Sequence, residues 1–298
     1  MQNTLVTVLV GVSALGSLTS CAGEDPEILG TLENRPVPVV GTAPVPGQVG
    51  TPVDVPVDVP VVVDPPDPYS PREGTFKLLA YYKTRAFKHP SRIEGTKMLQ
   101  ELGRDNNFEV VVTETDEHIN REGLAQFEMV FFVNTTGDVF NDRQQNDFED
   151  WLMDGGAFAG THSATDTEEK WDFYKEVTGE YFNGHGSAGT QDQVRWEDDQ
   201  LDHPAVRGLP NPWRRSEEWY RFNGFVKQLN NNNQNGWRVL GRIGSNNQPI
   251  TYIREWGSFR SFYTGLGHDE AVFKDDNFKK HILGAIMWGV RRDHLLDQ

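Results

Sequence analysis

The chain has 298 residues and a formal net charge of −16, which argues against a nucleic-acid partner because phosphate backbones are bound by clustered Lys and Arg. Aromatic residues make up 11% of the chain, so a substantial core can form. The single cysteine, Cys21, excludes an internal disulfide, a cysteine zinc site and a thiol nucleophile in the rest of the chain.

The first 21 residues have the pattern of a bacterial lipoprotein signal. The apolar and small-residue run Leu5–Leu18 is shorter than the roughly 20 residues that cross a bilayer. It leads into LTSC, which resembles a lipobox and ends at Cys21. One departure is that residues 1–4 contain no Lys or Arg. We predict a cleaved signal over 1–21, lipidation of Cys21, and a cell-envelope location, periplasmic or surface-exposed, with the lipid anchor as the only membrane contact.

Residues 22–73 are predicted to be a disordered tether. The segment is rich in Pro, Val, Gly and Asp, and the unit Pro-Val-Asp-Val begins at both Pro52 and Pro56. Frequent proline removes backbone donors and favours extended polyproline II. At about 3.1 Å per residue, such a tether would reach on the order of 150 Å. A domain spanning 74–298 would then be held away from a membrane surface.

From residue 74 onward, strand-like and helix-like segments alternate. Apolar runs predict buried strands, and apolar residues at helical spacing predict helices, one of them capped by Asn141 or Asp142 and ending at Gly155-Gly156. The order predicts an α/β fold, an open and mostly parallel sheet with helices on both faces and an elaborated second half. The predicted strands are 76–82, 108–113, 129–133, 157–161, 193–197, 237–243, 250–256 and 260–266, and the other predicted helices are 92–105 and 276–290.

Four histidines follow strands or lie among glycines: His89, His162, His185 and His268. Loops after the carboxyl ends of strands converge on one crevice in an open α/β sheet, so these side chains are predicted to meet there. We expect His162 and His268 to be the acid/base pair, since imidazoles titrate near neutral pH.

Two carboxylates and the remaining histidines complete this prediction. Asp166 and Asp269 are candidates to orient the two imidazoles or to contact substrate. The other four histidines are predicted to be structural. We expect His118, His203 and His294 at the surface or in loops, and His281 on a helix.

The run EEWYRF, from Glu217 to Phe222, is a second candidate part of the site. Adjacent carboxylates on a strand point to opposite faces, so one is expected to face the cleft and the other solvent, with Glu218 assisting catalysis. Trp219 and Tyr220 suit the apolar face of a sugar ring, although an ordinary amphipathic strand would also carry this pattern.

The loop NTTGD is a candidate for binding developing negative charge through its backbone N–H groups. The predicted substrate-binding residues outside EEWYRF and the two aspartates are His89, Asn134, Thr135, Thr136 and Gly137. A phosphate-binding loop is excluded because GxxxxGK[ST] is missing and no GxGxxG opens a helix after the first strand. A serine-hydrolase elbow fits poorly because GTHSA, at residues 160–164, is not GxSxG.

An ordered series of motifs resembles the trehalose-utilisation (ThuA-like) family from about Phe76 to Val290: VFFVNTTGD, GGAFAGTHSATDT, WDFYKEVTGEYFNGH, DHPAVRGLP, EEWYRF and RSFYTGLGHDE. The resemblance implies a flavodoxin-like fold similar to class I glutamine amidotransferases, with His162 at or near the position of their nucleophilic cysteine. Since the only thiol is Cys21, glutamine hydrolysis through a thioester is excluded. The resemblance also implies a role in bacterial sugar metabolism, including oxidised 3-keto disaccharides.

Three hypotheses follow. The first is an extracytoplasmic enzyme acting on a carbohydrate through His162 and His268, with Glu218 and His185 assisting and no cofactor required. The second is a metal-dependent sugar hydrolase or isomerase with a divalent metal among His89, His162, His185 and His268, although no HxH or HExxH spacing is present. The third is a non-catalytic carbohydrate-binding surface lipoprotein. The sequence indicates no oligomeric state.

Overall fold

The structure, a computed structural model, describes residues 70–297 apart from 223, 225–228 and 230–234. The predicted signal, Cys21 and the tether as far as residue 69 lie outside the described residues. Among the helices that the structure describes, none is long and apolar enough to cross a membrane.

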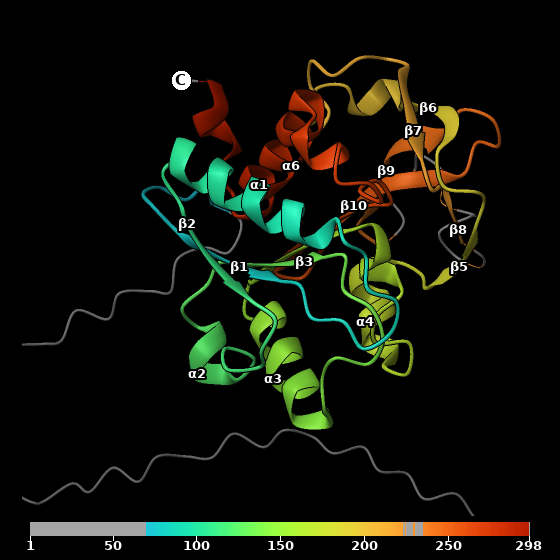
Figure 1. The fold of residues 1–298 in the computed structure, drawn as a ribbon. Helices are drawn as coiled ribbons and strands as arrows, with labels where there is room; N and C mark the ends of the chain where they lie inside the picture. Colours follow the sequence, from blue (N-terminus) through green and yellow to red (C-terminus); the bar gives the residue numbers. More distant parts are fainter. Residues whose placement is uncertain (1–69, 223, 225–228, 230–234, 298) are drawn as a thin grey trace, which may run out of the picture. The chain divides into compact units, whose positions relative to one another are not determined.

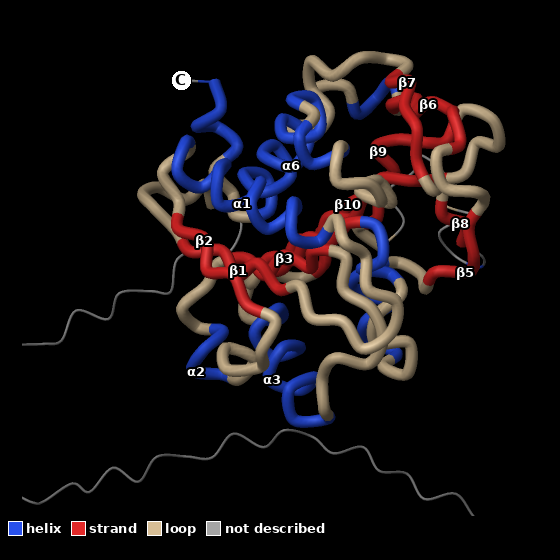
Figure 2. Tube along the Cα trace, viewed as in Figure 1, coloured by secondary structure: helices blue, strands red, loops and turns tan. Residues whose placement is uncertain are grey.

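The fold is built on a nine-stranded sheet in the order β2-β1-β3-β4-β11-β10-β9-β6-β7 (Figure 2). The first five strands in that order pair in parallel, and the last four extend the sheet in antiparallel fashion. The parallel strands are β1 (Lys77–Tyr81), β2 (Glu109–Thr113), β3 (Met129–Val133), β4 (Ala157–Thr161) and β11 (Phe259–Thr264). The antiparallel strands are β6 (Thr190–Trp196), β7 (Trp213–Glu217), β9 (Trp237–Ile243) and β10 (Pro249–Trp256).

Helices cover both faces of the parallel strands (Figure 1). One face carries α1 (Arg92–Asp105) and α6 (Asp276–Gly289), and the other carries α2 (Arg121–Leu124), α3 (Asp142–Met153) and α4 (Asp172–Thr178). A separate two-stranded sheet pairs β5 (Phe182–His185) with β8 (Tyr220–Phe222). Short 3₁₀ helices are η1 (His162–Thr165), η2 (Asp198–Gln200), η3 (Val272–Lys274) and η4 (Asp293–Asp297).

The predicted α/β fold class is confirmed, and local sequence explains its central elements. Every residue of β3 and of β4 is buried, as expected for strands covered on both faces. Asn141 caps α3 as predicted: its side chain accepts from the N–H of Gln144, whose side chain accepts in return from the N–H of Asn141. The predicted elaboration of the second half is the antiparallel extension together with the β5–β8 pair.

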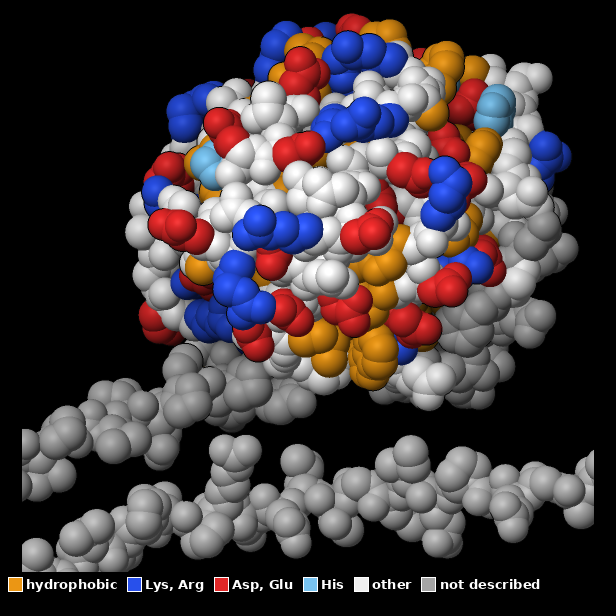
Figure 3. All heavy atoms as spheres, turned by 90° about the horizontal axis from the view of Figure 1, so that it is seen from below, with side chains coloured by type: hydrophobic (Ala, Val, Ile, Leu, Met, Phe, Trp, Pro, Cys, Tyr) orange, Lys and Arg blue, Asp and Glu red, His pale blue; other side chains and the backbone are white. Residues whose placement is uncertain are grey.

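Charges of both signs are mixed on the surface around α2 and α3. On the face seen from below in Figure 3, Lys and Arg side chains are interspersed with Asp and Glu side chains and do not gather by sign. Arg121 pairs with Asp150 between these two helices, and Arg143 pairs with Asp147 within α3. Such exposed pairs contribute little to stability, roughly 0–1 kcal/mol each.

Candidate functional site

Three of the predicted histidines and one glutamate meet beyond the carboxyl ends of the parallel strands. His89 lies between β1 and α1, His162 follows β4 directly, and His268 follows β11. These strands run parallel and lie close together in the sheet, so their carboxyl ends share one edge. Glu218, between β7 and β8, completes the group, and one ligand atom from each residue lies within 4.8 Å of the others. We refer to His89, His162, Glu218 and His268 as the His/Glu cluster.

His162 occupies a strained turn where β4 gives way to η1. Its φ of +46° lies in the left-handed region that L-residues rarely adopt. The turn is fixed by two buried tyrosines: Tyr263 donates its hydroxyl to the carbonyl of His162 at 2.7 Å, and Tyr174 donates to the carbonyl of Ala164 at 2.7 Å. Strain that is held in place in this manner is characteristic of functional positions.

Hydrogen bonds to the two buried imidazoles determine which nitrogen faces the cluster. His162 Nδ1 lies 3.1 Å from the carbonyl oxygen of Gly265 and therefore carries the proton, which leaves the lone pair on Nε2. His89 Nδ1 lies 3.2 Å from the hydroxyl oxygen of Ser163. Ser163 thus links the two turns that carry His89 and His162.

Three atoms of the cluster form a nearly equilateral triangle. His268 Nδ1 lies 3.2 Å from His162 Nε2 and 3.2 Å from Glu218 Oε2, and His162 Nε2 lies 3.4 Å from Glu218 Oε2. In a tetrahedral site with metal–ligand bonds of about 2.05 Å, two ligand atoms lie about 3.3 Å apart. The cluster therefore could hold a divalent metal ion, with His89 as the fourth protein ligand.

The environment of the cluster favours an ionised Glu218 carboxylate and a neutral His89 imidazole. Burial alone would raise the pKa of Glu218, but the hydrogen bond with His162 and the neighbouring His268 and His185 lower it below 4.5. Burial, followed by the neighbouring His162 and His268, lowers the pKa of His89 to about 3. An anionic carboxylate and a neutral imidazole are the forms that bind metal.

His185 lies beside the cluster and at its solvent side. Its Nδ1 is 3.1 Å from Glu218 Oε1, the carboxylate oxygen that points away from the triangle, and 2.7 Å from the carbonyl oxygen of Gly186. Its side chain is 44% exposed, whereas that of His162 is fully buried. Of the four predicted histidines, His185 is therefore the one that can exchange protons with solvent most directly.

One prediction about the two adjacent glutamates is wrong. Glu217 does not face solvent but is fully buried. Burial is tolerated because Arg215 pairs with its Oε1 at 3.1 Å, and because the backbone N–H groups of Gly267 and His268 donate to its two oxygens at 3.3 and 3.4 Å. Glu217 thus holds the turn that carries His268, while Glu218 lies in the cluster as expected.

The side chains and backbone of the loop after β3 form hydrogen bonds with neighbouring loops and do not line the cluster. Asn134 donates its side-chain amide to Ser91 and to the carbonyl of Gly267, and Thr135 bonds with Thr167. Thr136 accepts from Ala86 and donates to the carbonyl of Phe87. The N–H of Gly137 is donated to the carbonyl of Asp166 at 2.7 Å. These predicted substrate-binding residues are therefore engaged in fixing the loops that position His89 and His162.

The remaining predicted site residues lie at the margins of the cluster. The Tyr220 ring is buried and packs on His162 at a centroid distance of 4.0 Å. Trp219 is also buried and donates its indole N–H to the carbonyl of Thr190. Burial, followed by Glu169, raises the pKa of Asp166 to about 6. Asp269 is exposed, and its Oδ1 lies 4.0 Å from His268 Nε2.

Of the histidines predicted to be structural, one differs from expectation. His203 lies in a turn but is buried against Trp288 at a ring distance of 5.2 Å, and burial lowers its pKa to about 3. His281 lies on α6 as predicted, and burial lowers its pKa to about 4. His118 and His294 are partly exposed, as expected. Sequence reasoning did not identify Arg215 or its buried pairing with Glu217, for which the only signal is the alternation Arg-Ser-Glu on a strand.

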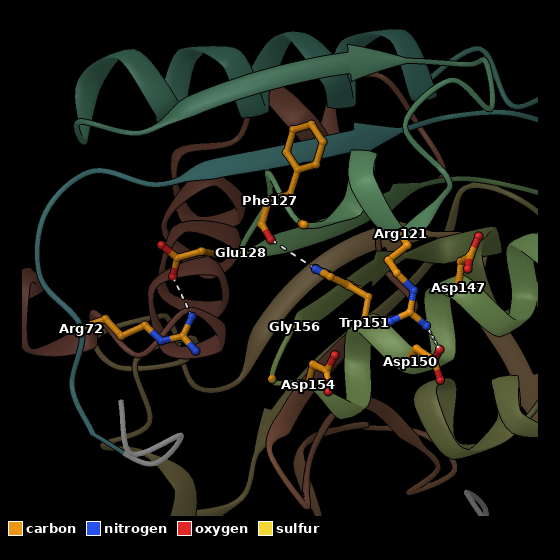
Figure 4. A pocket seen from close by; sticks show the side chains of 11 residues that line it. Arg72, Arg121, Phe127, Glu128, Asp147, Asp150, Trp151, Asp154 and Gly156 are labelled. Carbon is orange, nitrogen blue, oxygen red and sulfur yellow. Dashed lines mark hydrogen bonds and ion pairs between the residues drawn. The ribbon is translucent and has the colours of Figure 1, made fainter. Parts of the chain in front are cut away.

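A pocket of about 330 Å³ lies at the opposite, amino-terminal edge of the parallel strands (Figure 4). Phe127 and Glu128 line it just before β3, and Gly155 and Gly156 line it just before β4. Trp151 of α3 reaches across and donates its indole N–H to the carbonyl of Phe127 at 3.3 Å. None of the predicted site residues lines this pocket.

Solved structures with the same fold support the architecture. A ThuA-like protein from Bacteroides uniformis matches with a TM-score of 0.60 at 20% identity, over 74% of this chain and 92% of that chain. A ThuA-like protein from Parabacteroides merdae matches with a TM-score of 0.57 at 18% identity, over 72% of this chain and 90% of that chain. No curated protein matches the chain.

The class of protein follows from the fold: a flavodoxin-like α/β domain whose parallel strands end at a cluster of histidines. The family model described as trehalose utilisation, ThuA, matches residues 77–289, which include every residue of the His/Glu cluster. The chain belongs to the ThuA family.

Proposed function

We propose that this protein is an enzyme of carbohydrate metabolism and that its reaction takes place at the His/Glu cluster. The observation that carries the proposal is the convergence of His89, His162, His268 and Glu218 within 4.8 Å from four separate segments. Membership of a family described as trehalose utilisation supports a sugar substrate. A disaccharide or its 3-keto derivative is the substrate class we propose.

We further propose that the cluster binds one divalent metal ion, zinc being the ion whose tetrahedral geometry fits best. Support comes from the 3.2–3.4 Å triangle of His162, His268 and Glu218, and from the Gly265 carbonyl that fixes the tautomer of His162. With four protein ligands, a bound ion would have to accept a sugar carbonyl or a water as a fifth ligand in order to polarise or activate it.

In this arrangement the other side chains of the site have separate roles. His162 and His268 serve as ligands, and His185, half-exposed and paired with Glu218 Oε1, moves protons between substrate and solvent. The buried ring of Tyr220, which packs on His162, keeps water from one side of the cluster. Glutamine hydrolysis is no part of the proposal because the described domain contains no cysteine.

A metal-free acid/base enzyme is the second candidate. It is favoured by the 3.2 Å contact between His268 Nδ1 and His162 Nε2, across which a proton can be shared. In that case His162 and His268 transfer protons themselves, and Glu218 stabilises the charged imidazole. The two candidates differ in one respect: chelation abolishes the activity of the metal enzyme and leaves the acid/base enzyme active.

Turnover of a substrate panel tests the catalytic role. Trehalose, other disaccharides and their 3-keto derivatives are incubated with the wild-type protein and with the His162→Ala and His268→Ala variants. We expect turnover in the wild type and a loss of about 100-fold or more in each variant, because proton transfer and metal-ligand roles carry contributions of that size. The matched control is His294→Ala, which removes a partly exposed histidine paired with Glu73 and should retain full turnover.

Two outcomes would contradict the proposal. Normal turnover in both cluster variants would place the chemistry elsewhere. Saturable binding of a disaccharide by the wild type, with no product from any member of the panel, would establish a carbohydrate-binding module instead of an enzyme.

We also propose that the protein is a lipoprotein of the bacterial cell envelope, anchored through Cys21. The LTSC sequence and the proline-rich segment after it support this proposal. A Cys21→Ser variant should move from the membrane fraction to the soluble fraction and lose incorporation of labelled fatty acid. Retention of the variant in the membrane fraction would contradict the anchor.

A further inference from the structure

We propose that Phe87 forms a sugar-binding subsite beside the His/Glu cluster, with its ring as the surface on which the apolar face of the sugar stacks. The inference rests on the proposed carbohydrate function and specifies how the substrate is held. The sequence analysis did not name Phe87 as a candidate site residue, because an aromatic residue in a loop carries no periodic signal.

The exposure and position of Phe87 set it apart. Its side chain is 64% exposed, the highest value among the large hydrophobic residues that the structure describes as exposed. Isolated exposed hydrophobic residues are common on protein surfaces, so exposure alone carries little weight. Phe87, however, lies against the cluster: its ring centroid is 4.7 Å from that of His89, with the planes at 73°.

The loop that carries Phe87 is fixed by the loop after β3. Arg85 donates its N–H to the carbonyl of Thr136 at 2.7 Å, and Ala86 donates to the Thr136 hydroxyl at 3.3 Å. That hydroxyl donates in turn to the carbonyl of Phe87 at 2.9 Å. Gly137 permits this close approach, because a Cβ there would lie 3.0 Å from Cβ of Arg85. Phe87 is therefore presented to solvent by a braced backbone.

A braced, exposed aromatic ring next to polar groups matches the chemistry of a sugar. A pyranose has an apolar face of C–H groups that packs on an aromatic ring, and a rim of hydroxyls that need hydrogen-bond partners. His268, 18% exposed, lies next to His89 with a ring-centroid distance of 5.4 Å, and its Nε2 lies 4.0 Å from the Asp269 carboxylate. A ring stacked on Phe87 would thus have its hydroxyls near imidazole and carboxylate groups. Such pre-organisation lowers the entropy cost of binding.

The experiment compares Phe87→Ala and Phe87→Tyr with the wild type, using trehalose and 3-ketotrehalose as probes. Three quantities are measured: the dissociation constant by calorimetry, kcat and KM separately, and bound metal. We expect Phe87→Ala to raise Kd and KM about tenfold with metal content and kcat nearly unchanged, and Phe87→Tyr to restore binding. The matched control is Trp256→Ala, which removes an aromatic residue that is 37% exposed at the end of β10 and should leave both constants unchanged.

The outcomes separate this inference from the proposed function. Equal Kd and KM in Phe87→Ala and the wild type overturn the subsite and leave the proposed function standing. Failure of the wild type to bind these two probes or any other disaccharide or 3-keto derivative of the panel overturns both proposals. A fall in metal content in Phe87→Ala would assign the residue to support of His89 and would also overturn the subsite.

Discussion

At the scale of single residues, the buried pair Arg215–Glu217 decides where His268 lies. Glu217 accepts hydrogen bonds from the N–H groups of both Gly267 and His268, and Arg215 supplies the charge that compensates it. The Arg215 guanidinium in turn stacks over Trp213 at 4.1 Å. Removing one partner of such a pair leaves a buried charge unpaired and costs about 3–5 kcal/mol.

The first prediction concerns the Glu217→Gln variant. We expect it to unfold at lower denaturant concentration, by about 3 kcal/mol, and to bind Zn²⁺ about 10–100-fold more weakly, because the turn that carries His268 loses its charged acceptor. Urea unfolding and zinc calorimetry are the measurements. Glu255→Gln, which removes a partly exposed carboxylate paired with Arg238 on β9, is the control and should change neither value appreciably. Zinc affinity equal to that of the wild type would limit Glu217 to a structural role.

At the scale of elements, the parallel strands and the long helices are predictable from sequence because their patterns are local. The boundaries of β3, β4 and α1 coincide with the predicted residues, since each has a continuous apolar run or a helical face. The strands β5 and β8 have 4 and 3 residues and the helices α2 and α4 have 4 and 7, too few for a clear periodic pattern. Strand β7, WRRSE, has no continuous apolar run. These elements form because of tertiary contacts that no local pattern encodes.

The same limit applies to the site. Strand-end positions identified His89, His162 and His268, because topology alone brings the carboxyl ends of parallel strands together. The burial of Glu217 could not be predicted, because its partners Gly267 and His268 are distant in sequence. The role of Thr136 as a brace for the Phe87 loop depends likewise on a contact between residues 49 positions apart.

The second prediction tests the packing of α6. Gly284 lies on the helix face that meets the segment after η2, and a Cβ there would come 2.5 Å from the carbonyl carbon of Pro204 and 2.8 Å from Cα of Ala205. Alanine normally stabilises a helix interior by about 1 kcal/mol relative to glycine, but this overlap with backbone should outweigh that gain. We expect Gly284→Ala to lower the free energy of unfolding by about 1–2 kcal/mol in urea titrations.

Gly186→Ala is the matched control for this substitution. A Cβ at Gly186 would have no heavy atom within 4 Å, and the residue does not adopt a positive φ, so its replacement should change stability by less than about 0.5 kcal/mol. Equal stability of Gly284→Ala and the wild type would contradict the close packing of α6 against Pro204.

At the scale of the whole domain, Glu128, which directly precedes β3, forms ion pairs with residues near both ends of the described chain. Its carboxylate pairs with Arg72 at 2.8 Å and with Arg292 at 2.8 Å, and Arg292 also donates to the backbone carbonyls of Glu73 and Gly74. Burial alone would raise the pKa of Glu128, but the hydrogen bonds from Arg292 and Arg72 lower it below 4.5.

The third prediction concerns the pH dependence of the stability that the Glu128 ion pairs contribute. Because the folded-state pKa is depressed, the stabilisation is present above the unfolded-state pKa of about 4.5 and is lost as the pH falls through the folded-state value. Glu128→Gln should therefore be about 2 kcal/mol less stable than the wild type near neutral pH. The difference should shrink as the pH falls below about 4.5. Urea unfolding of both proteins across this range is the measurement, and a constant difference at every pH would contradict the role of the ionised carboxylate.

The most direct test of the central claim is the metal content of the domain. Protein purified without chelators and titrated with Zn²⁺ should bind about one ion per chain with high affinity, because the geometry of the His/Glu cluster matches one tetrahedral centre. The His162→Ala and His268→Ala variants should bind it far more weakly while remaining folded. Wild-type protein that retains no zinc after titration, or cluster variants that retain a full equivalent, would contradict the assignment of His89, His162, Glu218 and His268 as a metal centre.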